Sequence, residues 1–380
     1  MSTPQERPRF PFARPDVPRP ESWLPWLETA YEQRWFSNNG PLVRQLEAGI
    51  AARDAAAGRE AVTVASATAG LVAVLLALGV RGPVAVPAFT FPATAHAVAL
   101  AGCAPVLCDV DRATWELSPQ AAADAVRDRG CVAIVHVRAF GLCRDLGPIE
   151  QVARDAGVPL VVDSAAAFGG SLADGTPVGR AGDAEVFSFH ATKVFAAGEG
   201  GAVVCGPALA SEIRRTANFA LCGREVTGPG LNAKMSELTA AVALAMLDRL
   251  DDHVERRRAF AGDLLDACTA AGLPCERPVA AGRPPWQGLP LALPCAEARS
   301  RVLDRLAAAG VEARPYYAPG LHRTRAFAGC ASGPLPATDD LSDRVLCLPV
   351  YSTLQPGERE LLMGAVSDAF VAAPDALSRR

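Results

Sequence analysis

The chain has 380 residues, of which 50% are hydrophobic and 21% charged, and its formal net charge is −4. Such a length exceeds what one hydrophobic core usually supports, so we expect a larger domain over residues 1–250 and a smaller one over 251–380. The acidic balance without a basic stripe argues against nucleic acid as a partner. No apolar stretch reaches the length of a membrane span, which argues against a membrane protein and leaves the cytoplasm as the expected location.

The first 20 residues are rich in proline and arginine and lack the apolar core of a signal peptide, so they predict an extended arm. The eleven cysteines are scattered without a C-x-x-C pair, and the histidines also lack ligand spacing. We therefore expect neither a metal site nor a disulfide framework.

Between residues 60 and 206, short β-branched runs alternate with helical segments rich in alanine and leucine. Runs that are apolar on both faces are typical of a mostly parallel sheet covered by helices, which is an α/β architecture. Ligands of such sheets bind at the carboxyl ends of the strands. The candidate strands are 61–65, 83–87, 105–109, 131–137, 159–163, 184–189 and 201–205.

The remainder of the chain predicts a smaller α+β domain. Apolar residues at helical spacing run from Met235 into a charged stretch that ends near Phe260, as in one long helix connecting two domains. A strand is expected over Leu289–Leu293, a helix near 296–309 and a last helix from about Pro356 to Ala369.

Two residues predict the chemistry. Asp163 closes the apolar run 159–163, and the next strand leads to Lys193. A carboxylate and a lysine after successive strands are the layout that holds pyridoxal phosphate. The lysine amine can form an imine with the cofactor aldehyde, and the carboxylate can pair with the pyridinium nitrogen. Lys193 and Asp163 are therefore the candidate catalytic residues.

Eight short sequence motifs follow one another along the chain in an order that indicates a family. They are RWFSNNGPLV (34–43), ASATA (65–69), VPAFTF (86–91), SFHATK (188–193), GEGG (198–201), LNAKMSEL (231–238), RPYYAP (314–319) and CLPVY (347–351). Together they resemble the DegT/DnrJ/EryC1/StrS aminotransferases, which are sugar aminotransferases of fold type I. The resemblance spans roughly residues 22 to 365. It implies an aspartate aminotransferase-like fold, with a large domain around a mostly parallel sheet and a smaller α+β C-terminal domain.

The resemblance makes Lys193 the imine lysine and Asp163 the partner of the pyridinium nitrogen. Once an amino donor displaces the lysine, its free amine can carry a proton between the substrate carbon and the cofactor. His190 fits the family pattern too, either as a catalytic or as a supporting histidine.

Phosphate needs N–H groups and hydroxyls at the positive end of a helix. Ser66, Ala67, Thr68 and Ala69 supply them where the strand 61–65 gives way to a helix. Thr68 and the amide of Ala69 are the expected cradle, with simple N-capping as the alternative role of Thr68.

Three further cofactor contacts follow from the resemblance. Ser188 adds a hydroxyl to the phosphate, and Asn232 reaches the phosphate from the neighbouring subunit, which implies a homodimer with shared active sites. Phe91 stacks on the open face of the pyridine ring. The alternatives are a turn residue for Asn232 and core packing for Phe91.

The chain also departs from the family pattern. Ala166 stands where members usually place Gln or His near the phenolic oxygen of the cofactor. Arg138 replaces a common His, and Val194 replaces a common Asn after the lysine. These changes leave the lysine chemistry intact but affect the expectation for the substrate.

The leading hypothesis is a pyridoxal phosphate-dependent aminotransferase that converts a keto group of a nucleotide-linked deoxy sugar to an amine. Glutamate is the expected donor, in ping-pong chemistry of the kind used in amino sugar and antibiotic biosynthesis. One alternative acts on a keto-cyclitol or another specialised-metabolite ketone, which the departures at Ala166, Arg138 and Val194 favour. Another is a pyridoxal phosphate-binding regulator without turnover.

Overall fold

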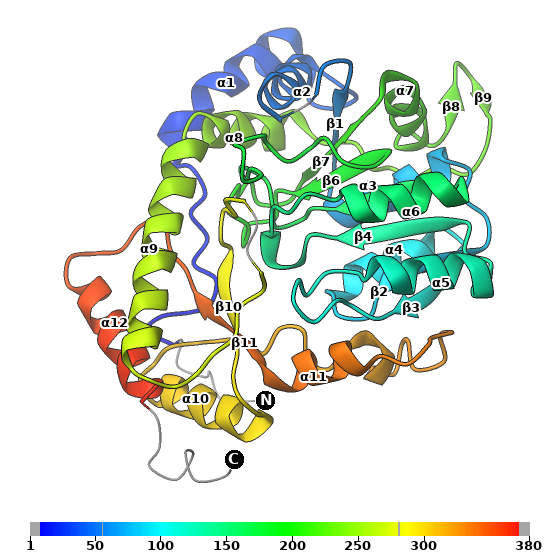
Figure 1. Ribbon diagram of the computed structural model, residues 1–380. Coiled ribbons are helices and arrows are strands. Elements are labelled where there is room, and N and C mark those ends of the chain that lie inside the picture. Colours follow the sequence, from blue (N-terminus) through cyan, green and yellow to red (C-terminus); the bar gives the residue numbers. More distant parts are fainter. Residues whose placement is uncertain (1–7, 55, 280–281, 372–380) are drawn as a thin grey trace, which may run out of the picture.

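The computed structural model describes residues 8–54, 56–279 and 282–371, built around a seven-stranded sheet (Figure 1). The strand order is β1-β7-β6-β5-β4-β2-β3, and only β7 runs against its neighbours. This confirms the mostly parallel sheet. The strands are β1 (Glu60–Val64), β2 (Pro83–Pro87), β3 (Ala104–Cys108), β4 (Ala133–Val137), β5 (Leu160–Asp163), β6 (Ala184–Ser188) and β7 (Gly201–Cys205).

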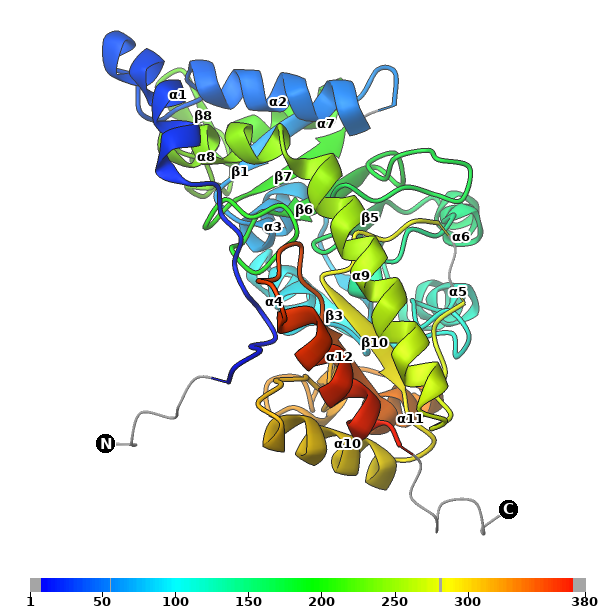
Figure 2. The ribbon, with the colours of Figure 1, turned by 90° about the vertical axis from the view of Figure 1, so that its left-hand side faces the viewer.

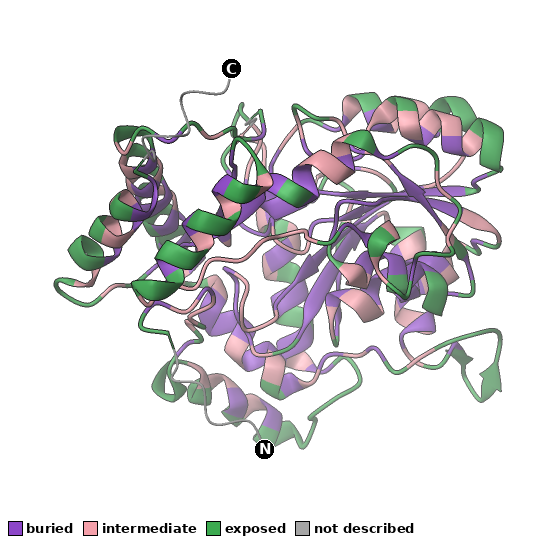
Figure 3. Cartoon of the chain, turned by 90° about the horizontal axis from the view of Figure 1, so that it is seen from below, coloured by how far each residue is buried: buried purple, intermediate pink, exposed green. Residues whose placement is uncertain are grey.

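Helices cover both faces of this sheet, which explains its apolar runs. Because successive side chains of a strand point to opposite faces, Val203 packs in one core with Leu71 while Val204 packs in another with Leu46. Figure 3 shows the buried strands between helices whose outer faces are exposed. One face carries α3 (Ala67–Ala77), α4 (Pro92–Leu100) and α7 (Pro207–Thr216), and the other α5 (Pro119–Arg129), α6 (Gly147–Ala156) and α2 (Pro41–Asp54).

The predicted long helix from Met235 to about Phe260 is wrong in one respect, since the structure divides it into α8 (Glu237–Leu247) and α9 (Leu250–Ala270). α8 packs against α2 and α1 (Pro20–Gln33), whereas α9 leaves the sheet and packs against α12 (Glu358–Ala369) (Figure 2). Because of the bend between them, α8 packs on the large domain while α9 packs on the C-terminal part. Leu247 and Leu250 continue the apolar spacing across it, so the pattern does not reveal the break.

The C-terminal part has a core of its own. The antiparallel pair β10 (Gly288–Ala292) and β11 (Val345–Pro349) packs with α9, α10 (Ala296–Ala308) and α12 around Leu264, Leu291 and Leu306. The predicted strand and two helices of this part are present. We propose that the boundary between the two domains lies at the bend before α9. The N-terminal arm crosses this division, because Phe10 packs in the C-terminal core. The first seven residues of the predicted arm lie outside the described residues.

Short elements complete the chain: η1 (Ala139–Gly141), β8 (Leu221–Cys222), β9 (Glu225–Val226), η2 (Leu321–Arg323) and α11 (Pro336–Arg344). No helix within the described ranges is both long and apolar enough to cross a membrane.

Candidate active site

A cavity of about 520 Å³ lies at the carboxyl ends of the central strands. Strand ends contribute Asp163 and Ser188, and the C-terminal part contributes Gln287, Arg314 and Tyr317. Segments far apart in the sequence therefore meet around one space. Eight of the sequence-predicted site residues line it: Ser66, Ala67, Thr68, Phe91, Asp163, Ala166, Ser188 and Lys193.

Asp163 is the last residue of β5, and its carboxylate is buried. Thr94 Oγ1 donates a hydrogen bond to Oδ2 at 2.8 Å, and the backbone N–H of Ala165 donates to Oδ1 at 3.1 Å. Burial raises the pKa of Asp163 despite these donors and the nearby Lys193. A cationic N–H partner in the cavity would stabilise the charged form of a carboxylate buried in this way.

Lys193 follows β6 and points its amine into the same cavity, where Nζ donates to Gln287 Oε1 at 3.0 Å. Burial lowers the pKa of Lys193 to about 8, although the Asp163 charge opposes the shift. An amine with this pKa is uncharged, and hence nucleophilic, far more often near neutral pH than an ordinary lysine. Gln287 Nε2 donates to the carbonyl of Thr192 at 3.2 Å, which orients the amide oxygen toward Nζ.

The start of α3 lies between the cavity and a surface groove. Ser66 caps this helix, because its Oγ accepts a hydrogen bond from the N–H of Ala69 at 3.2 Å. The capping role considered for Thr68 is thus held by Ser66, while Thr68 lines the cavity. Ala69 does not line the cavity; together with Ser66 and Thr68 it lines the neighbouring groove, which Leu231 also borders.

Of the remaining residues predicted to contact the cofactor, Phe91 and Ser188 line the cavity and Asn232 does not. The Phe91 side chain is 54% exposed at the cavity, ahead of α4. Ser188 Oγ accepts from the N–H of His190 at 3.3 Å, and His190 Nδ1 pairs with Thr192 Oγ1 at 2.8 Å. Asn232 is exposed outside the cavity of its own chain, where its Oδ1 accepts from Lys234 Nζ at 2.7 Å. A single subunit therefore does not bring Asn232 to the other predicted residues.

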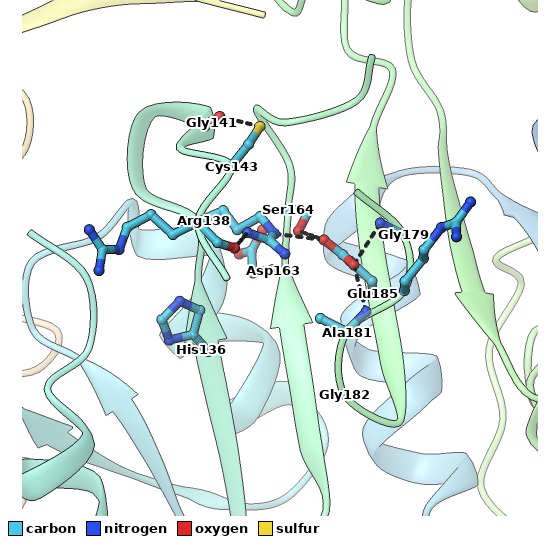
Figure 4. Close-up of polar contacts among 12 residues, drawn as sticks. His136, Arg138, Gly141, Cys143, Asp163, Ser164, Gly179, Ala181, Gly182 and Glu185 are labelled. Atoms are coloured by element: carbon cyan, nitrogen blue, oxygen red, sulfur yellow. Dashed lines mark hydrogen bonds and ion pairs between the residues drawn. The ribbon is translucent and has the colours of Figure 1, made fainter. Parts of the chain in front are cut away.

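The structure shows where the three residues that depart from the family pattern lie. Ala166 lines the cavity, and its carbonyl oxygen would lie 2.4 Å from a Cβ on Gly141 in the loop after β4, so this contact accounts for the glycine at position 141. Arg138 forms a buried ion pair, with Nε donating to Glu185 Oε1 at 2.8 Å (Figure 4). Its charge thus neutralises a carboxylate beneath the cavity. Val194 is buried in the core behind the lysine.

Sequence reasoning missed Gln287, Thr94 and Glu185. The signal for Glu185 was available, since it is the one charged residue in the strand 184–188 and Arg138 follows a nearby strand. Gln287 and Thr94 carry no such signal, because only the tertiary fold brings them to Lys193 and Asp163.

The sequence of residues 21–367 matches the DegT/DnrJ/EryC1/StrS aminotransferase family. The chain belongs to this family. The predicted family and the predicted class of enzyme, an aminotransferase, are thereby confirmed. The predicted fold class is confirmed by the seven-stranded sheet and by the solved structures that resemble this chain.

Three similar proteins illustrate the relationship. Protein Rv3402c of Mycobacterium tuberculosis is 33% identical over 96% of this chain and 91% of its own length. The dTDP-4-amino-4,6-dideoxy-D-glucose transaminase of Shigella dysenteriae is 34% identical over 66% of this chain and 68% of its own. The crystal structure of DesI with its TDP-sugar product superposes with a TM-score of 0.87 at 34% identity, covering 97% of this chain and 94% of that one.

Proposed function

We propose that this aminotransferase uses pyridoxal phosphate to aminate a keto group of a nucleotide-linked deoxy sugar, with glutamate as the amino donor. The observation that carries the proposal is the pairing, in one cavity, of a lysine whose pKa is about 8 with a buried carboxylate. Perturbed groups of complementary type in a cleft are typical of catalytic sites.

The residues of the cavity fit the cofactor. Lys193 would hold it covalently, and Asp163 would accept a hydrogen bond from its ring nitrogen. The hydroxyls of Thr68 and Ser188 and the start of α3 would bind its phosphate, and Phe91 would cover the open face of the ring. When bound, pyridoxal phosphate supplies an electron-withdrawing ring that stabilises negative charge on the substrate carbon.

The protein's own groups then perform orientation and proton transfer. Thr94 and the Ala165 N–H hold the Asp163 carboxylate in one position. Gln287 holds the Lys193 amine in the cavity. In its uncharged form, Lys193 Nζ can accept a proton from the substrate carbon and return it, as general base and then general acid.

The substrate class rests on relatives. DesI and the Shigella dysenteriae enzyme are both named for TDP- or dTDP-linked sugars, and both are about a third identical to this chain. This supports a nucleotide-linked sugar over a keto-cyclitol. Arg138, whose departure favoured the latter, borders the cavity but is held by its ion pair with Glu185.

The test separates the two half-reactions. Protein loaded with pyridoxal phosphate should change its near-visible absorbance when glutamate is added. After removal of glutamate, dTDP-linked 4-keto-6-deoxy sugar should be aminated, with the product identified by mass. Amination of a keto-cyclitol but of no nucleotide-linked sugar would contradict the substrate class, and no response to any donor would contradict the aminotransferase chemistry of this site.

We further propose a homodimer in which Asn232 completes the partner's site. Asn232 lies outside its own cavity, beside a segment that borders the groove at the start of α3. Large apolar side chains are exposed in the same region, including Leu100 at 70% and Phe219 at 47%. Such exposure is typical of interaction surfaces.

Complementation tests the shared site. A Lys193→Ala chain and an Asn232→Asp chain should each be inactive, while their heterodimer should regain activity in one intact site. A heterodimer of verified composition that stays inactive, or a fully active monomer, would contradict the shared site. We also propose the cytoplasm as the location, which the eleven free thiols support because disulfides are rare there.

A further inference from the structure

The N-terminal arm reaches the active-site cavity. Phe12, with only 5% of its surface exposed, lines the same cavity as Lys193. The stretch that matches the family begins at residue 21, after this segment. The arm thus lies before the matched region, and it places an aromatic ring in the wall of the site.

Several contacts hold the arm in place on both sides of Phe12. The N–H of Phe10 donates to the carbonyl of Gly310, and the N–H of Phe12 donates to Glu312 Oε2, both at 2.9 Å. Arg14 forms two hydrogen bonds to the Glu358 carboxylate, at 2.8 and 3.1 Å. The position of the Phe12 backbone is thus fixed by the C-terminal part.

The ring of Phe12 is packed as tightly as its backbone. It meets the Tyr316 ring edge-on at 5.6 Å between centroids, and the Arg314 guanidinium lies 5.1 Å from its centroid. Tyr316 and Arg314 also line the cavity. The three side chains therefore form one continuous wall.

Gly288 makes room for this ring. A Cβ at Gly288 would lie 2.8 Å from Cζ of Phe12 and 3.0 Å from its Cε2, closer than atoms can approach without displacement. Gln287, the residue before it, holds the Lys193 amine. The ring consequently occupies the space that a side chain at position 288 would take, next to the residue that orients the lysine.

We propose that Phe12 is a specificity-determining residue, whose ring, admitted by Gly288, limits the size of the group that can reach Lys193. The proposal rests on the proposed function, because it concerns the acceptor of that same site. Shortening Phe12 would enlarge the cavity beside Lys193, while the strand-end residues Asp163 and Ser188 would stay in place.

Two hydroxylamines of different size test the proposal in protein loaded with pyridoxal phosphate. Methoxyamine and O-benzylhydroxylamine each remove the cofactor from Lys193, and the loss of the near-visible band gives both rates. In Phe12→Ala, the rate with the benzyl reagent relative to methoxyamine should rise about tenfold, the lower range for steric discrimination in an apolar pocket. An unchanged ratio, or an equal rise with both reagents, would overturn the proposal.

The matched control is Tyr351→Phe. The Tyr351 hydroxyl donates to the carbonyl of Pro11 in the same arm, but Tyr351 does not line the cavity. Removal of the Tyr351 hydroxyl should leave the ratio of the two rates unchanged. The control therefore distinguishes an effect of the size of the Phe12 ring from an effect of a loosened arm. Should Phe12→Ala not fold, Phe12→Leu makes the same test with a smaller expected change.

A double-mutant cycle tests the steric argument by unfolding, without any reaction. Gly288→Ala should lower the denaturant midpoint strongly in the unaltered chain and less in Phe12→Ala, where the ring is absent. Equal effects in both backgrounds would show that the ring does not occupy the space at position 288. A different result would contradict the proposed function itself, namely that no cofactor binds at Lys193 in the unaltered chain.

Discussion

The buried ion pair between Arg138 and Glu185 provides a prediction with a magnitude. Glu185 has no exposed surface, and its carboxylate accepts from Arg138 Nε, from Ser164 Oγ at 2.6 Å, and from the N–H groups of Gly179 at 2.7 Å and Ala181 at 3.2 Å. Removing one partner of a buried pair typically costs about 3–5 kcal/mol. Since three donors to Glu185 would remain, we expect Arg138→Ala to cost about 3 kcal/mol, the lower end of that range.

The pH dependence distinguishes a lost charge partner from lost packing. Burial alone would raise the pKa of Glu185, but Arg138 and the hydrogen bonds outweigh it and lower the pKa below its ordinary value of 4.5. The depressed pKa contributes stability above pH 4.5 that is lost as the pH falls through the folded-state pKa. In Arg138→Ala we expect burial to outweigh the remaining hydrogen bonds, so that the pKa of Glu185 rises and stability is lost instead as the pH rises above 4.5.

The assay is denaturant unfolding of both proteins at pH 5 and pH 7.5. The stability deficit of Arg138→Ala should be smaller at pH 5 than at pH 7.5. The double variant Arg138→Met/Glu185→Met, which removes both charges, should recover much of the loss. A deficit below about 0.5 kcal/mol, the scale of an ordinary surface substitution, or one independent of pH, would refute the buried-pair argument.

Three further predictions concern the catalytic cavity. Asp163→Asn should slow the half-reaction with glutamate at least about tenfold, or about 1.4 kcal/mol of barrier, while cofactor occupancy stays nearly unchanged; a rate within about threefold in a stopped-flow assay would disprove the pairing. The rate at which Lys193 reacts with added pyridoxal phosphate should rise with pH around its pKa of about 8, and a midpoint near the ordinary 10.5 would contradict the burial argument. Gln287→Glu should move that midpoint upward, because a carboxylate would then face the Lys193 amine, whereas Gln287→Met, which keeps the length without the charge, should not produce an upward shift.

The sequence predicts the strands of the sheet better than it predicts the contacts between segments that lie far apart in the chain. The strands were recognisable because both faces of the sheet are buried, so each strand is a short apolar run between helices. The same reasoning selected Asp163, which closes such a run, and Lys193, which follows the next strand. The bend between α8 and α9 was hidden, since apolar spacing continues through it while the partners of the helix change.

The missed residues share a physical cause. Gln287 and Phe12 reach the cavity from segments distant in the sequence, and no periodicity within either segment indicates that contact. Arg138 was recognised as a departure, but its role depends on Glu185 of β6, which is separated from β4 by β5. Such pairings are properties of the tertiary fold, which local patterns do not contain.

Lys193 is proposed as the residue that holds the cofactor, and the composition of the chain allows a test in one measurement. The chain contains only two lysines, Lys193 and Lys234, so each serves as a control for the other. Protein loaded with pyridoxal phosphate, reduced with borohydride and digested, should carry the pyridoxyl mass on the peptide of Lys193 and not on that of Lys234, whose Nζ lies outside the cavity against Asn232. A label on Lys234 in equal yield, or a Lys193→Ala protein that still transfers amino groups, would show that Lys193 does not hold the cofactor.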